Sequence, residues 1–121
     1  MNSATMSPQE VRKLWSDSLR SGAYKQGKYR LRMFDDRYCC LGVLCDLAVK
    51  HGVIPEPSRS DGYFVYEGEA CQLPKAVCNW AGLNSIAGSF REGPGSLVTL
   101  NDSGNYSFQQ IATIIDTTPL R

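Results

Sequence analysis

The sequence contains only one histidine, His51. This scarcity argues against a zinc site with paired histidines and against a cysteine nucleophile activated by a histidine. Structural zinc sites use paired ligands at short spacing, but Cys39 and Cys40 are adjacent, and one histidine cannot complete a second pair. A cysteine nucleophile would use His51 as its base, yet Cys40 lies eleven residues away along one expected helix, roughly 16 Å at 1.5 Å per residue. The sequence therefore predicts no metal site, no catalytic residue and no cofactor.

Long apolar runs and a strong net charge are also missing. No run approaches the roughly 20 apolar residues that a membrane helix needs, and the opening MNSATMSPQE lacks the pattern of a signal peptide. Neither a GxGxxG nor a GK[ST] phosphate loop occurs. A net charge of +1 argues against general nucleic-acid binding, because affinity for phosphate backbones grows with the number of basic contacts. We therefore expect a cytoplasmic protein with no membrane partner.

The length and composition are those of one globular domain. A chain of 121 residues with 42% hydrophobic and 21% charged residues can bury one modest core. Because helical and hairpin-like segments are interleaved without a regular βαβ rhythm, we predict an α+β fold. It would comprise a small antiparallel sheet of about three to five strands packed with three main helices. The domain spans residues 1–121, and residues 1–6 and 117–121 are expected to fray.

Helix signals are strong at three places. The segments SPQE at residues 7–10 and SFQQ at residues 107–110 have capping-box spacing, and each precedes apolar residues at helical spacing. Between them, residues 39–51 are apolar around most of a helical circumference, which predicts a buried central helix. A shorter helix is expected over residues 74–81, with Gly82 closing it.

The five cysteines are predicted to be free thiols that fill the core. Their number is odd, and thiols in the cytoplasm are kept reduced. Three of them, Cys39, Cys40 and Cys45, lie in the stretch RYCCLGVLCDLAVKHG beside leucine and valine. A buried free cysteine behaves as a small hydrophobe, so packing is the expected role.

Strand-like alternation marks residues 28–33, where Lys28, Arg30 and Arg32 alternate with apolar residues. We expect them to project from one face of a strand that turns at Asp35 and Asp36. A second hairpin is expected to turn at residues 67–68, and NDSGN, residues 101–105, is interpreted as an Asx-type turn. Residues 1–37 carry 8 − 4 = +4 charges and the remainder 5 − 8 = −3, so the basic face lies in the positive half.

Cations, aromatic rings and amides together suit a phosphate-bearing, nucleotide-like ligand, through charge-assisted hydrogen bonds and stacking. The same set suits a protein interface, and a solvated strand face is a third interpretation. Because a chain of this size has little room for a deep pocket, such a site would most naturally lie between subunits of a homo-oligomer. The candidate ligand-binding residues are Gln26, Lys28, Arg30, Arg32, Arg37, Tyr38, Tyr63, Asn101 and Asp102.

Four stretches in this order resemble a widespread family of small, mostly uncharacterised proteins encoded by bacteriophages and prophages: LRSGAYKQGKYRLR, RYCCLGVLCDLA, LPKAVCNWAGL and LVTLNDSGNYSFQQIATIID. The resemblance spans about Leu19 to Asp116, and its most specific parts are YCCLGVLCDLA and the LNDxG-x2-SF-x2-IA-x2-I pattern. It implies a viral accessory protein expressed in the cytoplasm of a host bacterium, and it carries no activity with it. Among the matching positions, Gln26, Asn101 and Asp102 have no evident structural reason.

By analogy, small phage proteins without a catalytic constellation resemble inhibitors of bacterial immunity. The expected function is a non-enzymatic binder that counteracts anti-phage defence by sequestering a small nucleotide-derived signal. A protein that plugs the surface of a bacterial defence protein is the first alternative. A small hydrolase that degrades the nucleotide signal is the second.

Overall fold

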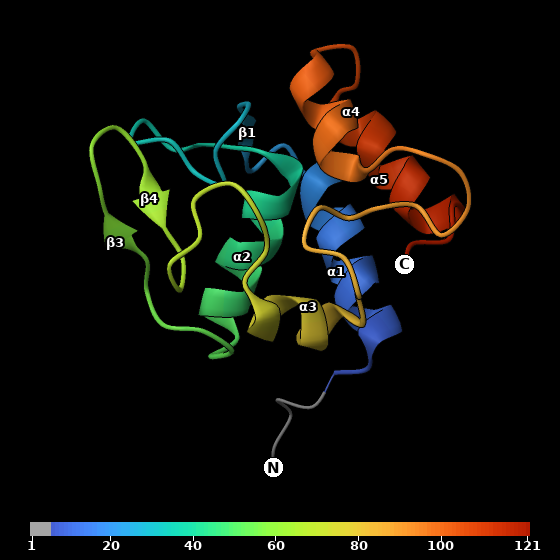
Figure 1. Ribbon diagram of the computed structural model, residues 1–121, viewed down its shortest axis with the longest axis horizontal. Coiled ribbons are helices and arrows are strands. Elements are labelled where there is room, and N and C mark those ends of the chain that lie inside the picture. Colours follow the sequence, from blue (N-terminus) through green and yellow to red (C-terminus); the bar gives the residue numbers. More distant parts are fainter. Residues whose placement is uncertain (1–5) are drawn as a thin grey trace.

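The computed structural model describes residues 6–121 of the chain, which contain five helices and two small sheets (Figure 1). The α+β class and the single domain are confirmed. Fraying at residues 1–5 lies outside the described residues, and Met6 packs against the core. None of the helices in residues 6–121 is long and apolar enough to cross a bilayer. The elements are α1 (Pro8–Arg20), β1 (Lys25–Gln26), β2 (Arg37–Tyr38), α2 (Cys40–Lys50), β3 (Ser58–Arg59), β4 (Phe64–Val65), α3 (Lys75–Ala81), α4 (Leu97–Ser103) and α5 (Phe108–Thr117).

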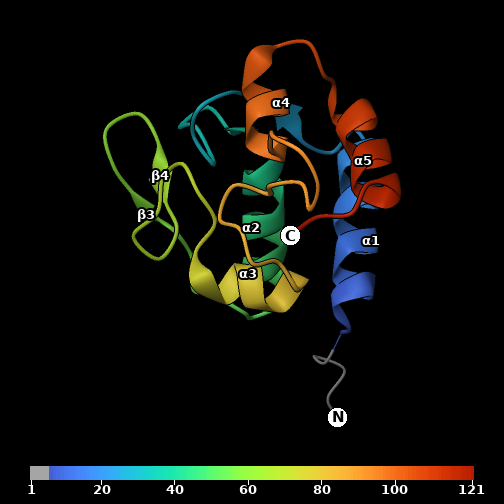
Figure 2. The same cartoon turned by 45° about the vertical axis from the view of Figure 1, so that its right-hand side comes forward.

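Helix α2 lies at the centre of the molecule, as its apolar circumference predicts. Figure 2 shows α1 and α5 side by side on one flank of α2 and the β3–β4 hairpin on the other. The buried Trp15 of α1 fixes this packing, because its indole Nε1 donates a hydrogen bond of 2.8 Å to the carbonyl oxygen of Cys40. Helix α2 ends at Lys50, His51 is its C-cap, and Gly52 follows in the left-handed region with a φ of 73°.

The packing role of the cysteines is confirmed for four of the five. Cys39, Cys40, Cys45 and Cys78 are buried free thiols, whereas Cys71 is exposed. Burial raises the pKa of Cys39 to about 12, although backbone hydrogen bonds partly oppose the shift. Burial also raises the pKa of Cys40 and Cys45 well above the ordinary value. These thiols therefore remain protonated at neutral pH.

Thiol labelling should separate Cys71 from the other cysteines. In the native protein, DTNB is expected to modify Cys71 rapidly, and the buried thiols should react only as the protein unfolds. Cys40→Ala and Cys45→Ala should each lower the free energy of unfolding by about 1 kcal/mol and leave binding intact. Cys71→Ser is the control and should abolish the fast phase. Rapid native-state labelling of Cys40 or Cys45 would contradict the packing assignment.

Both predicted capping boxes are present, and they set the first residues of α1 and α5. The Ser7 hydroxyl accepts from the Glu10 N–H at 3.1 Å, and the Glu10 carboxylate accepts from the Ser7 N–H at 2.8 Å. Ser107 and Gln110 repeat this exchange at 3.2 and 2.8 Å. Each box satisfies two backbone donors that a helix start otherwise leaves without partners.

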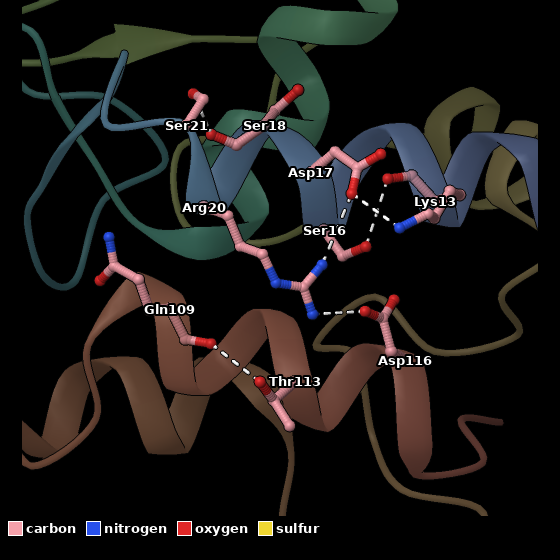
Figure 3. A network of polar contacts seen from close by, with 9 residues as sticks. All are labelled: Lys13, Ser16, Asp17, Ser18, Arg20, Ser21, Gln109, Thr113 and Asp116. Carbon is pink, nitrogen blue, oxygen red and sulfur yellow. Dashed lines mark hydrogen bonds and ion pairs between the residues drawn. The ribbon is translucent and has the colours of Figure 1, made fainter.

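Helices α1 and α5 are also joined by a polar network along their exposed edge (Figure 3). The guanidinium of Arg20 forms ion pairs with Asp116 of α5 and Asp17 of its own helix. Burial raises the pKa of Asp116, but hydrogen bonds from Arg20 and Ser16 and the charges of Arg20 and Lys13 lower it by more. The network thus keeps this carboxylate ionised and joins α1 to α5.

The expected single antiparallel sheet is wrong. Strands β1 and β2 form a parallel pair, and β3 and β4 form a separate antiparallel pair. The alternation at residues 28–33 does not form a continuous strand, because Tyr29 has a left-handed φ of 73°. Its N–H donates to the carboxylate of Asp102 at 2.9 Å, while the N–H of the buried Leu31 donates to the carbonyl of Ala70 at 2.7 Å. Lys28 is therefore separated from Arg30 and Arg32 by a backbone reversal.

The second hairpin begins earlier in the chain than predicted. Strands β3 and β4 are joined by residues 60–63, ahead of the turn expected at residues 67–68. The turn predicted at Glu67 and Gly68 does exist, with φ values of 50° and 83°. It closes only one residue pair, in which Tyr66 and Glu69 exchange two backbone hydrogen bonds of 2.8 Å.

Residues 97–103 form a helix, where the sequence predicted only a turn. Ser96 caps α4 by accepting a hydrogen bond from the Thr99 N–H at 3.2 Å, and Leu97 is buried. Gly104 ends α4 with a φ of 79°, so Asn101 and Asp102 belong to its last turn and not to an Asx-type turn.

Residues 117–121, which the sequence predicts to fray, pack against the rest of the chain in the structure. Leu120 is 1% exposed and forms a bridge with Phe90. The Arg121 N–H donates to the carbonyl of Ser89 at 3.0 Å, and its carbonyl accepts from the N–H of Asn84 at 3.1 Å. A buried leucine and these backbone bonds hold the tail in place.

Candidate functional site

The structure divides the nine predicted site residues between two places. Five of them surround the backbone at Gly27 and Lys28, between β1, β2 and the last turn of α4. The other four lie toward the β3–β4 hairpin. The first group is Gln26, Lys28, Arg37, Asn101 and Asp102, and the second is Arg30, Arg32, Tyr38 and Tyr63.

Asn101 is the centre of the hydrogen bonds in the first group. Its side chain is buried at 1% exposure. Its Oδ1 accepts from the Cys40 N–H at 3.2 Å and from Gln26 Nε2 at 3.0 Å. Its Nδ2 donates to the Gly27 carbonyl at 2.8 Å and to Asp102 Oδ1 at 3.2 Å. This side chain therefore connects α2, α4 and β1. The sequence alone gave no structural reason for an asparagine at position 101, and these hydrogen bonds supply one.

Gln26 and Asp102 position the walls of the site. Gln26 Nε2 donates a second hydrogen bond, of 2.9 Å, to the carbonyl of Tyr106. Asp102 fixes the backbone reversal at Tyr29 through the N–H bond described above. Together with Asn101 they tie residues 26–29 to the end of α4 and to the loop that follows it.

The cations of the second group are bound within the protein. Arg32 Nε and Nη2 donate to the Asp36 carboxylate at 2.9 and 2.6 Å, and the guanidinium lies 4.1 Å from the centre of the Phe64 ring and 5.3 Å from that of Tyr38. Arg30 lies 4.2 Å from the centre of the Tyr63 ring. These cation–π contacts pack the β3–β4 hairpin against residues 30–38. Because the Arg32 guanidinium is occupied by Asp36 and two rings, few of its donors remain for a ligand.

All of the first group except Asp102 lines two adjoining depressions, which we name the Gly27–Lys28 site. The larger, about 390 Å³, is lined by Gln26, Gly27, Lys28, Tyr29, Met33 and Arg37. The smaller, about 200 Å³, is lined by Gln26, Gly27, Lys28, Asn101, Gly104 and Tyr106.

The two cations of this site, Arg37 and Lys28, differ in whether they form an ion pair within the protein. Arg37 Nε donates to Asp35 at 2.9 Å, and both side chains are largely exposed. Lys28 forms no ion pair with any residue between 6 and 121. An ammonium group with no carboxylate partner in the described chain is free to meet an external anion.

Two tyrosines that are not among the nine candidate residues complete the site. The alternating pattern placed Tyr29 on the face of a strand opposite Lys28, but its backbone is left-handed and its side chain is 65% exposed. Tyr106 is 37% exposed in the loop between α4 and α5. No local signal predicts the reversal at Tyr29, because it depends on Asp102 more than 70 residues away.

A larger depression, about 470 Å³, shares no residue with the predicted site. It is formed mainly by the loop around residues 84–95 and by Arg121. The Gly27–Lys28 site is the stronger candidate, because it combines two cations with a largely exposed aromatic ring. In residues 6–121 no three His, Cys, Asp or Glu side chains gather closely enough to hold a metal ion.

A family model matches residues 6–119, which is nearly the whole chain. The chain belongs to this family, which is described as a domain of unknown function (DUF8296). Neither a curated protein nor a solved structure matches it. The family thus extends over both depressions and over the elements that hold them.

Proposed function

We propose that this protein binds a small phosphate-bearing, nucleotide-like ligand at the Gly27–Lys28 site and does not convert it. One observation carries the proposal: Lys28, Arg37 and the exposed ring of Tyr29 line one depression of about 390 Å³. Cations form charge-assisted hydrogen bonds with phosphate, and an exposed aromatic face stacks on a nucleobase. The volume lies within the roughly 300–1,000 Å³ of small-molecule sites.

The state of the thiols supports binding over turnover. Burial raises the pKa of Cys39 to about 12 and that of Cys40 and Cys45 well above the ordinary thiol value. A catalytic cysteine needs the opposite shift, because the thiolate is the nucleophile. These three cysteines therefore act as packing residues of the core.

The resemblance to phage-encoded proteins supplies the biological setting of the proposal. In a host bacterial cytoplasm, a protein that holds a nucleotide-derived immune signal would lower its free concentration and so blunt the defence. Such a protein needs affinity and abundance but no catalytic step. This part of the proposal rests on analogy between small phage proteins.

A second candidate function is inhibition of a defence protein by direct contact. Tyr29 is 65% exposed, Phe34 is 56% exposed, and Met33 and Arg37 lie beside Tyr29 in the larger depression. Aromatic residues, methionine and arginine are enriched in protein–protein interfaces. The same surface would then contact a protein and not a nucleotide.

The two candidates are separated by what the protein retains. The tagged protein is incubated with lysate of a phage-challenged, defence-bearing strain, washed and heat-denatured, and the released material is analysed by mass spectrometry. We expect an intact nucleotide, at least tenfold less of it with Lys28→Ala/Arg37→Ala, and an unchanged amount with Lys25→Ala. Lys25 is the matched control because it is an exposed neighbour that lines neither depression.

The other outcomes each select another function. A chemically altered nucleotide would indicate a hydrolase. Co-purification of a defence protein without any nucleotide would indicate the contact inhibitor. Equal nucleotide release from wild type and Lys28→Ala/Arg37→Ala would show that the binding surface lies elsewhere.

A further inference from the structure

The two depressions of the Gly27–Lys28 site share one wall and one charge. Both are lined by Gln26, Gly27 and Lys28, so this short backbone segment forms a ridge between them. Each depression also has one exposed tyrosine of its own, Tyr29 in the larger and Tyr106 in the smaller. The arrangement is aromatic ring, cation, aromatic ring.

Both tyrosines are held by the same group of hydrogen bonds. The Tyr29 N–H donates to Asp102 at 2.9 Å, and the Tyr106 carbonyl accepts from Gln26 at 2.9 Å. Asn101 is bonded to both Gln26 and Asp102, at 3.0 and 3.2 Å. The backbones of the two tyrosines are thus fixed relative to each other while their rings extend toward solvent, which lowers the entropy cost of binding.

The position of Lys28 between the depressions depends on Gly104. A Cβ built on Gly104 would lie 2.6 Å from Lys28 Nζ, so the ammonium rests where any other residue would place a side chain. Gly104 lies at the carboxyl end of α4, where the helix dipole favours a cation. The ammonium therefore lies at the junction, where it can reach a phosphate that spans it.

The sizes of the depressions favour one ligand that occupies both. The larger, about 390 Å³, is sufficient for a small ligand, but the smaller, about 200 Å³, falls below the roughly 300 Å³ of an independent pocket. We infer that the ligand is a dinucleotide, with its bridging phosphate at Lys28 and one base stacked on each of Tyr29 and Tyr106. This inference rests on the proposed function and specifies the ligand class.

Isothermal titration calorimetry with AMP, GMP, pApA and pGpG tests the inference on the full chain. At least one dinucleotide should bind about tenfold or more tightly than its mononucleotide. Tyr106→Ala should weaken the dinucleotide about tenfold and leave the mononucleotide unchanged, because only the dinucleotide reaches the smaller depression. Tyr29→Ala should weaken both.

Phe34→Ala is the matched control, because Phe34 is an exposed aromatic residue on the same loop that lines neither depression. Thermal melting should show that all three variants are folded. Equal affinity for mononucleotide and dinucleotide, with no effect of Tyr106→Ala, would overturn the inference and leave the proposed function standing. Absence of binding by all four probes would overturn both.

Discussion

Replacing Gly42 by alanine is expected to destabilise the protein severely, although the same change in an ordinary helix interior stabilises by about 0.5–1 kcal/mol. A Cβ on Gly42 would lie 1.7 Å from the carbonyl oxygen of Leu31 and 2.5 Å from its carbonyl carbon. Those are backbone atoms of a fully buried residue, and the Leu31 carbonyl also accepts from the Cys39 N–H at 3.3 Å. Relieving the clash would separate α2 from this segment, at a cost of about 4 kcal/mol or more.

Urea unfolding followed by circular dichroism measures this effect. The control is Gly93→Ala, because nothing lies within 4 Å of a Cβ built on Gly93, whose φ is 77°. That variant should lose only about 1 kcal/mol, the cost of a left-handed alanine. A Gly42→Ala variant as stable as wild type would mean that Leu31 does not pass this close to α2.

Replacing Asn101 by alanine is expected to cost about 3 kcal/mol or more of unfolding free energy. The variant leaves the Gly27 carbonyl and the Cys40 N–H without the partners that now bond them at 2.8 and 3.2 Å. Each buried polar group without a partner costs about 1–3 kcal/mol. The change also removes the contact that joins β1 to the first turn of α2.

Chemical denaturation gives the size of this loss, and hydrogen exchange gives its location. Exchange of the Cys40 amide should accelerate more than that of amides in α5, because Asn101 bonds it directly. Asn105→Ala is the control, since Asn105 is exposed and should change stability by less than about 0.5 kcal/mol. Equal stability of the two variants would contradict the role of Asn101.

The helices could be predicted where their signals are local. Ser7 with Glu10 and Ser107 with Gln110 stand three residues apart, and these pairs form the bonds that their spacing predicts. The continuous apolar surface of residues 40–48 likewise predicts burial without knowledge of the partners. Short-range chemistry was sufficient in these segments.

The sheet and the tail could not be predicted, because distant residues decide them. The reversal at Tyr29 requires Asp102, and the course of Leu31 requires the carbonyl of Ala70. Leu120 is buried in the core beside the loop that contains Phe90, about 30 residues earlier in the chain. No pattern within any of these segments encodes its partner.

The candidate site was predicted in part. Gln26, Lys28 and Asn101 line the smaller depression together, although 75 residues separate Gln26 from Asn101. The expected face of Lys28, Arg30 and Arg32 is divided, since Arg32 is paired with Asp36. Tyr106 was missed because its place beside the site depends on where α4 ends.

The pairing of α1 with α5 has a consequence for synthesis of the chain (Figure 2). Roughly 90 residues separate the two helices. At about 5–20 residues per second, α5 leaves the ribosome on the order of 5–20 s after α1. Trp15 can meet Cys40 early, but the side of α1 that faces α5 stays uncovered throughout this interval. The nascent chain is therefore expected to fold late and to depend on chaperones until α5 emerges.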